Sequence, residues 1–148
     1  MNKEFYYFAY GMNTNLDSMD LRCPGARPMG YATLPGYEFR FATHADIVPK
    51  LDSYVDGVLW VINFTHLESL DALEGFPSYY NRIELPVYFE GRTFEATTYF
   101  MQPGMKDEPP AKGYWDMVIE GYHENGVPTT QLYEAFNKSI DQKIQYIV

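Results

Sequence analysis

Apolar runs rich in aromatic and β-branched residues alternate along this chain with short polar segments that contain glycine or proline. The run 5–10 ends at Gly11 and predicts a buried strand. The dipeptides Pro35-Gly36 and Glu90-Gly91 are typical of turns between strands. The strands that we expect span 31–34, 37–43, 54–63, 82–89 and 92–101, besides the first, and 45–53 is expected to be irregular.

Four segments have the signals of helices. The helices are expected at 16–22, before Pro24 and Gly25; at 65–74, from a capping box Thr65-His66-Leu67-Glu68 to Gly75; at 113–125, before Gly126; and after Thr129 or Thr130, with the apolar stripe Leu132, Phe136, Ile140 and Ile144. About six strands with helices between and after them predict an α+β fold, a small mixed β-barrel with flanking helices. We expect a single domain over residues 1–148.

Composition and charge narrow the class of protein. A hydrophobic fraction of 46% in 148 residues is enough for one core. The net charge of −9 repels polyanions, so neither nucleic acid nor a membrane is an expected partner. The only cysteine, Cys23, excludes an internal disulfide and is expected to be a buried structural thiol. We therefore expect a cytoplasmic protein, and composition leaves a homodimer open.

Glu74 is the most informative acidic residue. In a helix that starts at Thr65, Leu67, Leu70 and Glu74 lie at i, i+3 and i+7, so the glutamate shares the stripe that the leucines assign to the interior. Loss of water and the nearby helix C-terminus both raise the pKa of a carboxyl group, as a general base near neutral pH needs. Periodicity alone leaves two alternatives open, a solvated carboxylate at a frayed helix end and an ion pair with Arg82.

Two other places could bind a ligand. The backbone amides of 10–13 could cradle an anion at the end of the first strand, or this segment is an ordinary turn. Tyr114 could orient a ligand from the start of a helix, or it anchors the core. The histidines His44, His66 and His123 do not have the spacing of metal ligands, and we expect no metal site.

Taken in order along the chain, these elements resemble the γ-glutamylcyclotransferase (AIG2-like) family. The resemblance covers nearly the whole chain, and the serine of the family's Tyr-Gly-Ser-Asn element is Met12 here. The motifs are Tyr7-Phe8-Ala9-Tyr10-Gly11-Met12-Asn13; Leu21-Arg22-Cys23-Pro24; Gly57-Val58-Leu59-Trp60; Leu70-Asp71-Ala72-Leu73-Glu74-Gly75 with Tyr80 and Arg82 after it; Pro109-Pro110 to Tyr114; and Glu124-Asn125-Gly126-Val127-Pro128.

The resemblance implies an enzyme that cyclises a γ-glutamyl amide, of an amino acid or an amine, to 5-oxoproline and releases the amine, without metal or organic cofactor. It implies that Glu74 is the proton acceptor. The residues implied in substrate binding are Tyr7, Phe8, Ala9, Tyr10, Gly11, Met12, Asn13 and Tyr114, with Tyr80 and Arg82 as candidates for support. We expect the leaving-group side of the pocket to use 45–53 and 103–112. The alternative is a catalytically inactive module of the same fold that binds a small ligand.

Overall fold

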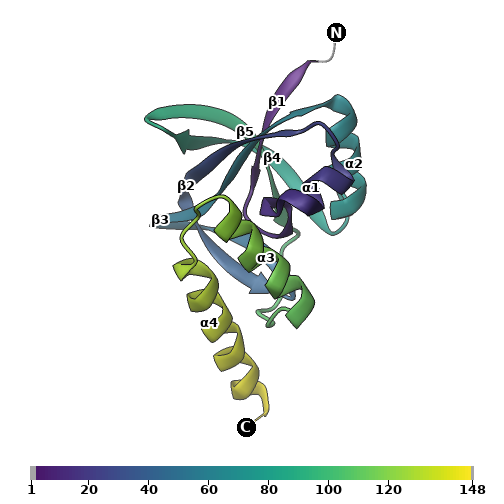
Figure 1. Ribbon diagram of the computed structural model, residues 1–148. Helices are drawn as coiled ribbons and strands as arrows, with labels where there is room; N and C mark the ends of the chain where they lie inside the picture. Colours follow the sequence, from purple (N-terminus) through teal and green to yellow (C-terminus); the bar gives the residue numbers. More distant parts are fainter. Residues whose placement is uncertain (1–2, 148) are drawn as a thin grey trace.

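Five strands close into a mixed β-barrel in the computed structural model of the chain (Figure 1). The structure describes residues 3–147 and side chains up to residue 141; residues 1, 2 and 148 of the predicted domain and the side chain of Ile144 lie outside the described part. The strands are β1 (Glu4–Ala9), β2 (Arg27–Ala42), β3 (His44–Asn63), β4 (Tyr80–Phe89) and β5 (Arg92–Met101). Their order around the barrel is β1-β3-β2-β4-β5, and a short parallel pairing of β1 with β5 closes it.

The predicted fold class is confirmed, but the number of strands and several strand boundaries differ. The predicted strands 31–34 and 37–43 are parts of one strand, β2, and Pro35-Gly36 is not a turn but the place where the register with β3 shifts. The chain reverses instead at Thr43, which has a positive φ of 69° between the paired Ala42 and His44. The segment 45–53, predicted to be irregular, therefore belongs to β3.

The first strand and the last hairpin agree with the sequence pattern. β1 ends one residue before Tyr10, and β4 and β5 meet at Glu90-Gly91, where both residues have positive φ. Gly57, within β3, marks a close approach of two backbones. A Cβ on Gly57 would lie 2.4 Å from the Ala9 carbonyl oxygen, so glycine at this position lets β3 pack tightly against β1.

Helix α1 (Leu16–Arg22) agrees with the prediction, and the segment before it forms a short 3-10 helix, η1 (Met12–Thr14). Helix α2 (Phe64–Glu74) ends before Gly75, which is left-handed, as predicted. The predicted capping box at Thr65 and Glu68 is wrong. Asn63 is the N-cap and accepts a hydrogen bond from the His66 amide, while the His66 side chain accepts one from the Asn63 amide. An asparagine at the end of β3 thus starts the helix before Thr65 is reached.

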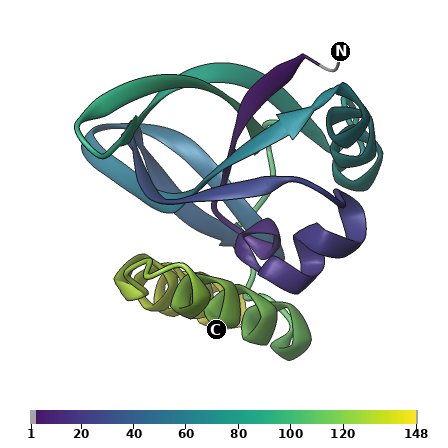
Figure 2. The same ribbon diagram turned by 45° about the horizontal axis from the view of Figure 1, so that its top comes forward.

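Helices α3 (Lys112–Glu124) and α4 (Thr130–Ile147) lie along one side of the barrel, while α1 and α2 lie together at another (Figures 1 and 2). The fully buried Tyr122 of α3 donates a hydrogen bond to the Tyr10 carbonyl, and Gln131 of α4 donates one to the Tyr122 hydroxyl. Gly121 lets α3 approach η1 closely, since a Cβ there would lie 2.3 Å from Thr14 Oγ1. Helix α3 is therefore fixed against the segment that follows β1.

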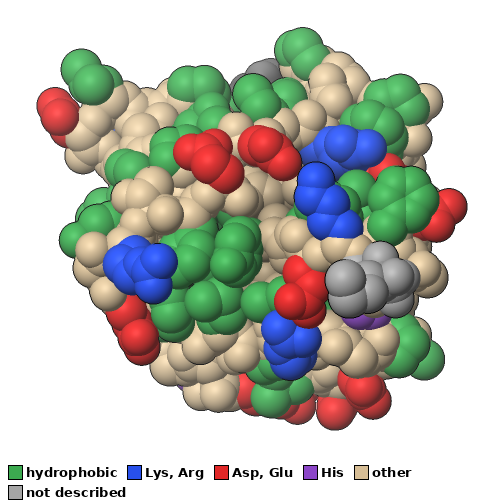
Figure 3. All heavy atoms as spheres, turned by 90° about the horizontal axis from the view of Figure 1, so that it is seen from above, with side chains coloured by type: hydrophobic (Ala, Val, Ile, Leu, Met, Phe, Trp, Pro, Cys, Tyr) green, Lys and Arg blue, Asp and Glu red, His purple; other side chains and the backbone are tan. Residues whose placement is uncertain are grey.

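The distribution of charged side chains on the described surface agrees with the negative net charge of the sequence. On the face that Figure 3 shows, basic side chains are dispersed among acidic and hydrophobic ones. None of the described helices combines the length and the apolar character that crossing a membrane requires.

Candidate active site

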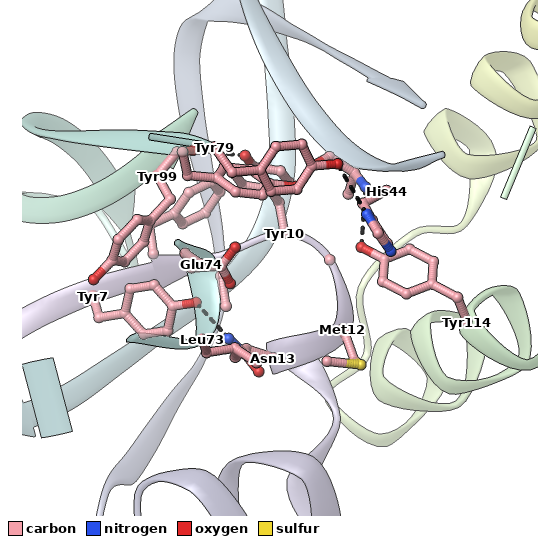
Figure 4. A pocket seen from close by; sticks show the side chains of 15 residues that line it. Tyr7, Tyr10, Met12, Asn13, His44, Leu73, Glu74, Tyr79, Tyr99 and Tyr114 are labelled. Carbon is pink, nitrogen blue, oxygen red and sulfur yellow. Dashed lines mark hydrogen bonds between the residues drawn. The ribbon is translucent and has the colours of Figure 1, made fainter. Parts of the chain in front are cut away.

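A pocket of about 200 Å³ opens at the end of the barrel where β1 and β5 end and β3 and β4 begin (Figure 4). Tyrosines form much of its wall, and it includes every predicted binding residue as well as Glu74 and Tyr80. The lining residues are Tyr7, Phe8, Ala9, Tyr10, Gly11, Met12, Asn13, His44, Ala45, Leu73, Glu74, Tyr79, Tyr80, Tyr99 and Tyr114.

Glu74 is the last residue of α2 and points into this pocket (Figure 4). Leu70, one turn earlier, is fully buried, so the stripe inferred from periodicity does face the interior. Burial raises the pKa of Glu74 to about 7, and the Arg22 guanidinium acts in the opposite direction. Near neutral pH this carboxyl group can therefore both accept and return a proton.

Arg82 does not pair with Glu74, so that alternative is wrong. Its guanidinium donates two hydrogen bonds to Asp71, with Nε 2.8 Å from Oδ1 and Nη2 3.2 Å from Oδ2. The guanidinium carbon also lies 4.3 Å from the centroid of the Phe76 ring. The Tyr99 hydroxyl donates a third hydrogen bond to Asp71, at 2.6 Å. Because Asp71 lies three residues before Glu74, these contacts fasten the end of α2 to β4 and β5. Arg82 itself lies outside the pocket lining.

The segment after β1 folds back as η1 and places the Gly11, Met12 and Asn13 backbone at the pocket. Asn13 is buried, and its side-chain amide donates to the Tyr7 hydroxyl at 3.1 Å. A Cβ on Gly11 would lie 2.9 Å from both the Tyr114 hydroxyl and the Ala45 side chain. Glycine therefore allows Tyr114 to touch this segment.

Three pocket tyrosines use their hydroxyl protons within the protein. Tyr10 donates to the Tyr99 carbonyl at 2.6 Å, and Tyr80 donates to the Ala45 carbonyl at 2.6 Å. Tyr99, as described, donates to Asp71. A phenol has one proton to donate, so these hydroxyls are committed within the protein: those of Tyr10 and Tyr80 join neighbouring strand ends, and that of Tyr99 joins β5 to α2.

Tyr7 and Tyr114 differ, because each accepts a hydrogen bond from the protein. Tyr7 accepts from Asn13, and Tyr114 accepts from the Ala45 amide at 3.0 Å. Their own protons can then point to a ligand or to Glu74. Burial, followed for Tyr7 by the charge of Glu74, raises the pKa of both phenols, so both are neutral donors at neutral pH.

Sequence reasoning missed His44 and Tyr79. His44 Nδ1 lies 3.0 Å from the Tyr79 hydroxyl, and its ring is edge-on to Tyr114 with centroids 5.0 Å apart. Burial lowers the pKa of His44, which favours the neutral imidazole. The sequence signal was weak, because His44 precedes a segment that was predicted to be irregular rather than a strand beside the pocket.

The expected leaving-group segments are corrected by the structure. Of 45–53 only Ala45 lines the pocket, because the remainder continues along β3. No residue of 103–112 lines it. That segment contacts the β2–β3 turn instead, where the Thr43 amide donates to the Glu108 carbonyl at 3.0 Å.

The remaining reactive side chains have structural partners. His66 belongs to the cap of α2, and Cys23 is buried with its pKa raised to about 11, which leaves the thiol unreactive. Within residues 3–141, no group of His, Cys, Asp and Glu side chains could hold a metal ion.

Comparisons with known proteins agree with one another. The sequence model of the family described as gamma-glutamyl cyclotransferase, AIG2-like, matches residues 7–117. The curated gamma-glutamylcyclotransferase of Homo sapiens is 32% identical over 140 residues, 85% of this chain and 74% of that protein. The Mus musculus protein of the same name is 32% identical over 151 residues, 93% and 79% respectively. A solved structure of a gamma-glutamyl cyclotransferase superimposes with a TM-score of 0.81 at 29% identity, covering 90% of this chain and 86% of the other.

Proposed function

The chain belongs to the AIG2-like gamma-glutamyl cyclotransferase family and is an enzyme of that class, and we propose that it converts a γ-glutamyl amide to 5-oxoproline and a free amine. The observation that carries the proposal is Glu74, a carboxyl group with a pKa of about 7 in a pocket otherwise lined by neutral side chains. That arrangement suits proton transfer by one side chain.

The nucleophile is the α-amine of the substrate. Its nitrogen attacks the γ-carbonyl carbon, a five-membered lactam forms, and the bond from that carbon to the leaving nitrogen breaks. A pocket of about 200 Å³ is small enough to hold the glutamyl chain in a folded pose. Holding the two reacting atoms together supplies rate through proximity, without a nucleophile from the protein.

Glu74 transfers protons from the α-ammonium group to the leaving nitrogen. Its carboxylate removes a proton from the α-ammonium group, which frees the lone pair for attack, and its carboxyl form returns a proton to the leaving nitrogen. After attack the ring nitrogen holds a second surplus proton, which the regenerated carboxylate accepts and passes to the amine, so the lactam is neutral and the amine departs as ammonium. A pKa of about 7 favours neither half of this cycle strongly over the other.

Donors around Glu74 are proposed to hold the substrate's oxygen atoms. The Tyr7 and Tyr114 hydroxyls have protons to donate, and the segment 11–13, whose backbone amides are further candidate donors, lines the pocket. Negative charge develops on the γ-carbonyl oxygen during attack, and donors already in place stabilise it without reorganising. Because the segment at 11–13 can work through its backbone, methionine at position 12 in place of serine is compatible with this role.

The proposal is tested by incubating the protein with γ-glutamyl-alanine and with γ-glutamyl-lysine and measuring 5-oxoproline. Wild-type protein is expected to release 5-oxoproline from at least one of them, and Glu74→Gln to release far less. Binding of both compounds without any 5-oxoproline would instead favour the inactive binding module.

A further inference from the structure

Arg22, the last residue of α1, belongs to the sequence element Leu21-Arg22-Cys23-Pro24, which has no part in the proposed mechanism. Its side chain is half-buried, and its Nε atom is shielded from solvent without a hydrogen-bond partner among residues 3–141. Arg40 and Arg82 each lie within 3.5 Å of a carboxylate oxygen, whereas Arg22 forms no ion pair with any described residue. A half-buried guanidinium without an acid costs free energy, so its position calls for an explanation.

The Arg22 guanidinium lies behind the pocket wall at Met12. Its Nη2 atom is 4.0 Å from Met12 Sδ, and Met12 lines the same pocket as Glu74 (Figure 4), while Arg22 itself is not a lining residue. A thioether is a weak acceptor, so this contact covers the cation without satisfying it. The acids of α1 itself, Asp17 and Asp20, are exposed and do not pair with it.

The end of α1 is fastened to the start of α2. The Cys23 Sγ atom lies 3.7 Å from the His66 carbonyl oxygen, and His66 Nε2 donates to the Pro24 carbonyl at 2.7 Å. The two residues after Arg22 are thus bound to the helix that ends at Glu74. The fold therefore sets where the guanidinium stands relative to this carboxyl group, without a direct contact between them.

Glu74 is the second unpaired ionisable group of this region. Its carboxyl group has neither a hydrogen bond nor an ion pair with a described residue. Burial raises the pKa of Glu74, and the positive charge of Arg22 is near enough to lower it. A cation in contact, as Arg82 is with Asp71, would occupy the carboxylate oxygens. A cation behind the wall attracts the same negative charge and leaves both oxygens free to accept a proton.

The other titratable groups around Glu74 keep their charge between pH 6.5 and pH 9. Burial raises the pKa of the pocket phenols and lowers the pKa of His44, so these groups stay neutral. Asp46 and Asp71 are each paired with an arginine, and Cys23, beside Arg22, has a pKa raised to about 11 by burial. The phenols are those of Tyr7, Tyr10, Tyr79, Tyr80, Tyr99 and Tyr114. Of the described lining residues, Glu74 alone changes charge in this range.

We propose that Arg22 is a positioning residue of the active site, whose guanidinium, held behind Met12, stabilises the carboxylate form of Glu74 so that the base is charged when substrate binds. This inference rests on the proposed function and adds the electrostatic partner of its base. It also accounts for the unpaired guanidinium, because the compensating charge is Glu74 rather than a residue in contact.

Titration of the Glu74 carboxyl group tests the pair without relying on turnover. The ¹³C resonance of this carboxyl carbon, identified by its absence in Glu74→Gln, is followed against pH. Arg22→Met removes the charge but keeps an unbranched side chain, and is expected to raise the titration midpoint by about 0.5 to 1 pH unit. Arg22→Lys keeps a cation and should restore most of the wild-type midpoint. Arg92→Met removes an exposed cation at the start of β5 and should leave the midpoint unchanged.

The pH dependence of kcat/KM is the second readout, with γ-glutamyl-alanine and γ-glutamyl-lysine as substrates. Relative to wild type, Arg22→Met should lose about threefold to sevenfold more activity at pH 6.5 than at pH 9, because its carboxylate fraction falls mainly at the lower pH. A loss of packing alone would lower activity by the same factor at both pH values.

The outcomes separate the inference from the proposed function. A wild-type midpoint in folded Arg22→Met, an equal shift in Arg22→Lys, or an equal loss of activity at both pH values overturns the inference alone. If Arg22→Met does not fold, the wild-type protein decides: the ¹⁵Nε resonance of Arg22 should move as Glu74 titrates and stay constant in Glu74→Gln. A resonance that does not move in the wild type overturns the inference. No 5-oxoproline from wild type with either substrate overturns the proposed function, and this inference with it.

Discussion

The Tyr114 hydroxyl lies directly against Gly11, so close that a Cβ at position 11 would come within 2.9 Å of the phenol oxygen. The contact joins the first turn of α3 to the segment after β1, across a gap of about a hundred residues in sequence. The same phenol accepts the Ala45 amide, so three elements meet at this one oxygen.

Gly11→Ala should therefore damage the site more than the fold. The new methyl group must displace Tyr114 or the Ala45 side chain, and a shift of this size is expected to lower kcat/KM by about tenfold to a hundredfold. Gly113→Ala is the matched control, because a Cβ there meets nothing within 4 Å and alanine suits a helix better. Steady-state kinetics and thermal unfolding of both variants check this. Equal activity of the two variants would contradict it.

Glu74→Gln should fold and bind substrate but turn over about a hundredfold more slowly or worse, because the amide cannot accept the proton. Glu68→Gln, an exposed change on the same helix, should keep wild-type turnover. 5-Oxoproline release and substrate binding are measured side by side. Wild-type turnover in Glu74→Gln would remove the glutamate from the mechanism.

The pKa of Glu74 also predicts two pH dependences. Activity requires the carboxylate, so kcat/KM should fall as the pH drops below about 7. Stability should change in the other sense. The folded protein holds this proton up to pH 7 whereas the unfolded chain loses it near pH 4, so the contribution of Glu74 to the free energy of unfolding is full below that range and is lost as pH rises through 7. Replacing Glu74 by glutamine removes this loss.

Thermal unfolding of wild type and Glu74→Gln at pH 5 and pH 8 measures the second effect. The variant should gain stability relative to wild type at pH 8 compared with pH 5. The same difference at both pH values would mean that the carboxyl group has an ordinary pKa.

The Asp71–Arg82 pair should act as a unit. Arg82→Met leaves Asp71 with only the Tyr99 hydroxyl, and it also removes the stacking on Phe76. We expect lower kcat through a looser end of α2, and a coupling energy with Asp71→Asn of about 0.5–3 kcal/mol in the free energy of unfolding. A double-mutant cycle by urea denaturation measures it. Strictly additive effects would show that the pair does not fasten the helix.

Met12→Ser should change kcat/KM by less than about tenfold, because the segment is proposed to act through backbone amides, whereas a lost donor to the oxyanion costs a hundredfold or more. The substitution does remove the contact between Met12 Sδ and Arg22. Kinetics of the single variant suffice, and a gain well above tenfold would assign the chemistry to a hydroxyl at this position.

The sequence predicted correctly those parts of the fold that neighbouring residues determine. The apolar run of β1, the Glu90-Gly91 hairpin and the inward face of Leu70 and Glu74 all follow from neighbours in sequence. The turn predicted at Pro35-Gly36 is wrong, because the same dipeptide is compatible with a turn and with a bulge. Only the pairing of β2 with β3 decides between the two.

Tertiary contacts account for the remaining errors. The sequence offers Arg82 two acidic partners on the same helix, Asp71 and Glu74. In the structure Arg82 pairs with Asp71, which the Tyr99 hydroxyl on β5 also binds. His44 is next to Tyr79 only because β3 begins where β4 begins in the closed barrel. No spacing within the sequence carries that information.

The hydrogen bonds of Tyr10 limit which pocket positions can tolerate substitution. Its hydroxyl donates to the Tyr99 carbonyl and its backbone carbonyl accepts from the Tyr122 hydroxyl, so β5 and α3 are both tied to this residue, and loss of the phenol would release β5. The His44 ring, by contrast, has a hydrogen bond only to the Tyr79 side chain among the described residues. Directed evolution toward new amides should therefore find its productive mutations at half-buried pocket positions such as His44. Deep mutational scanning should find Tyr10 among the least replaceable residues.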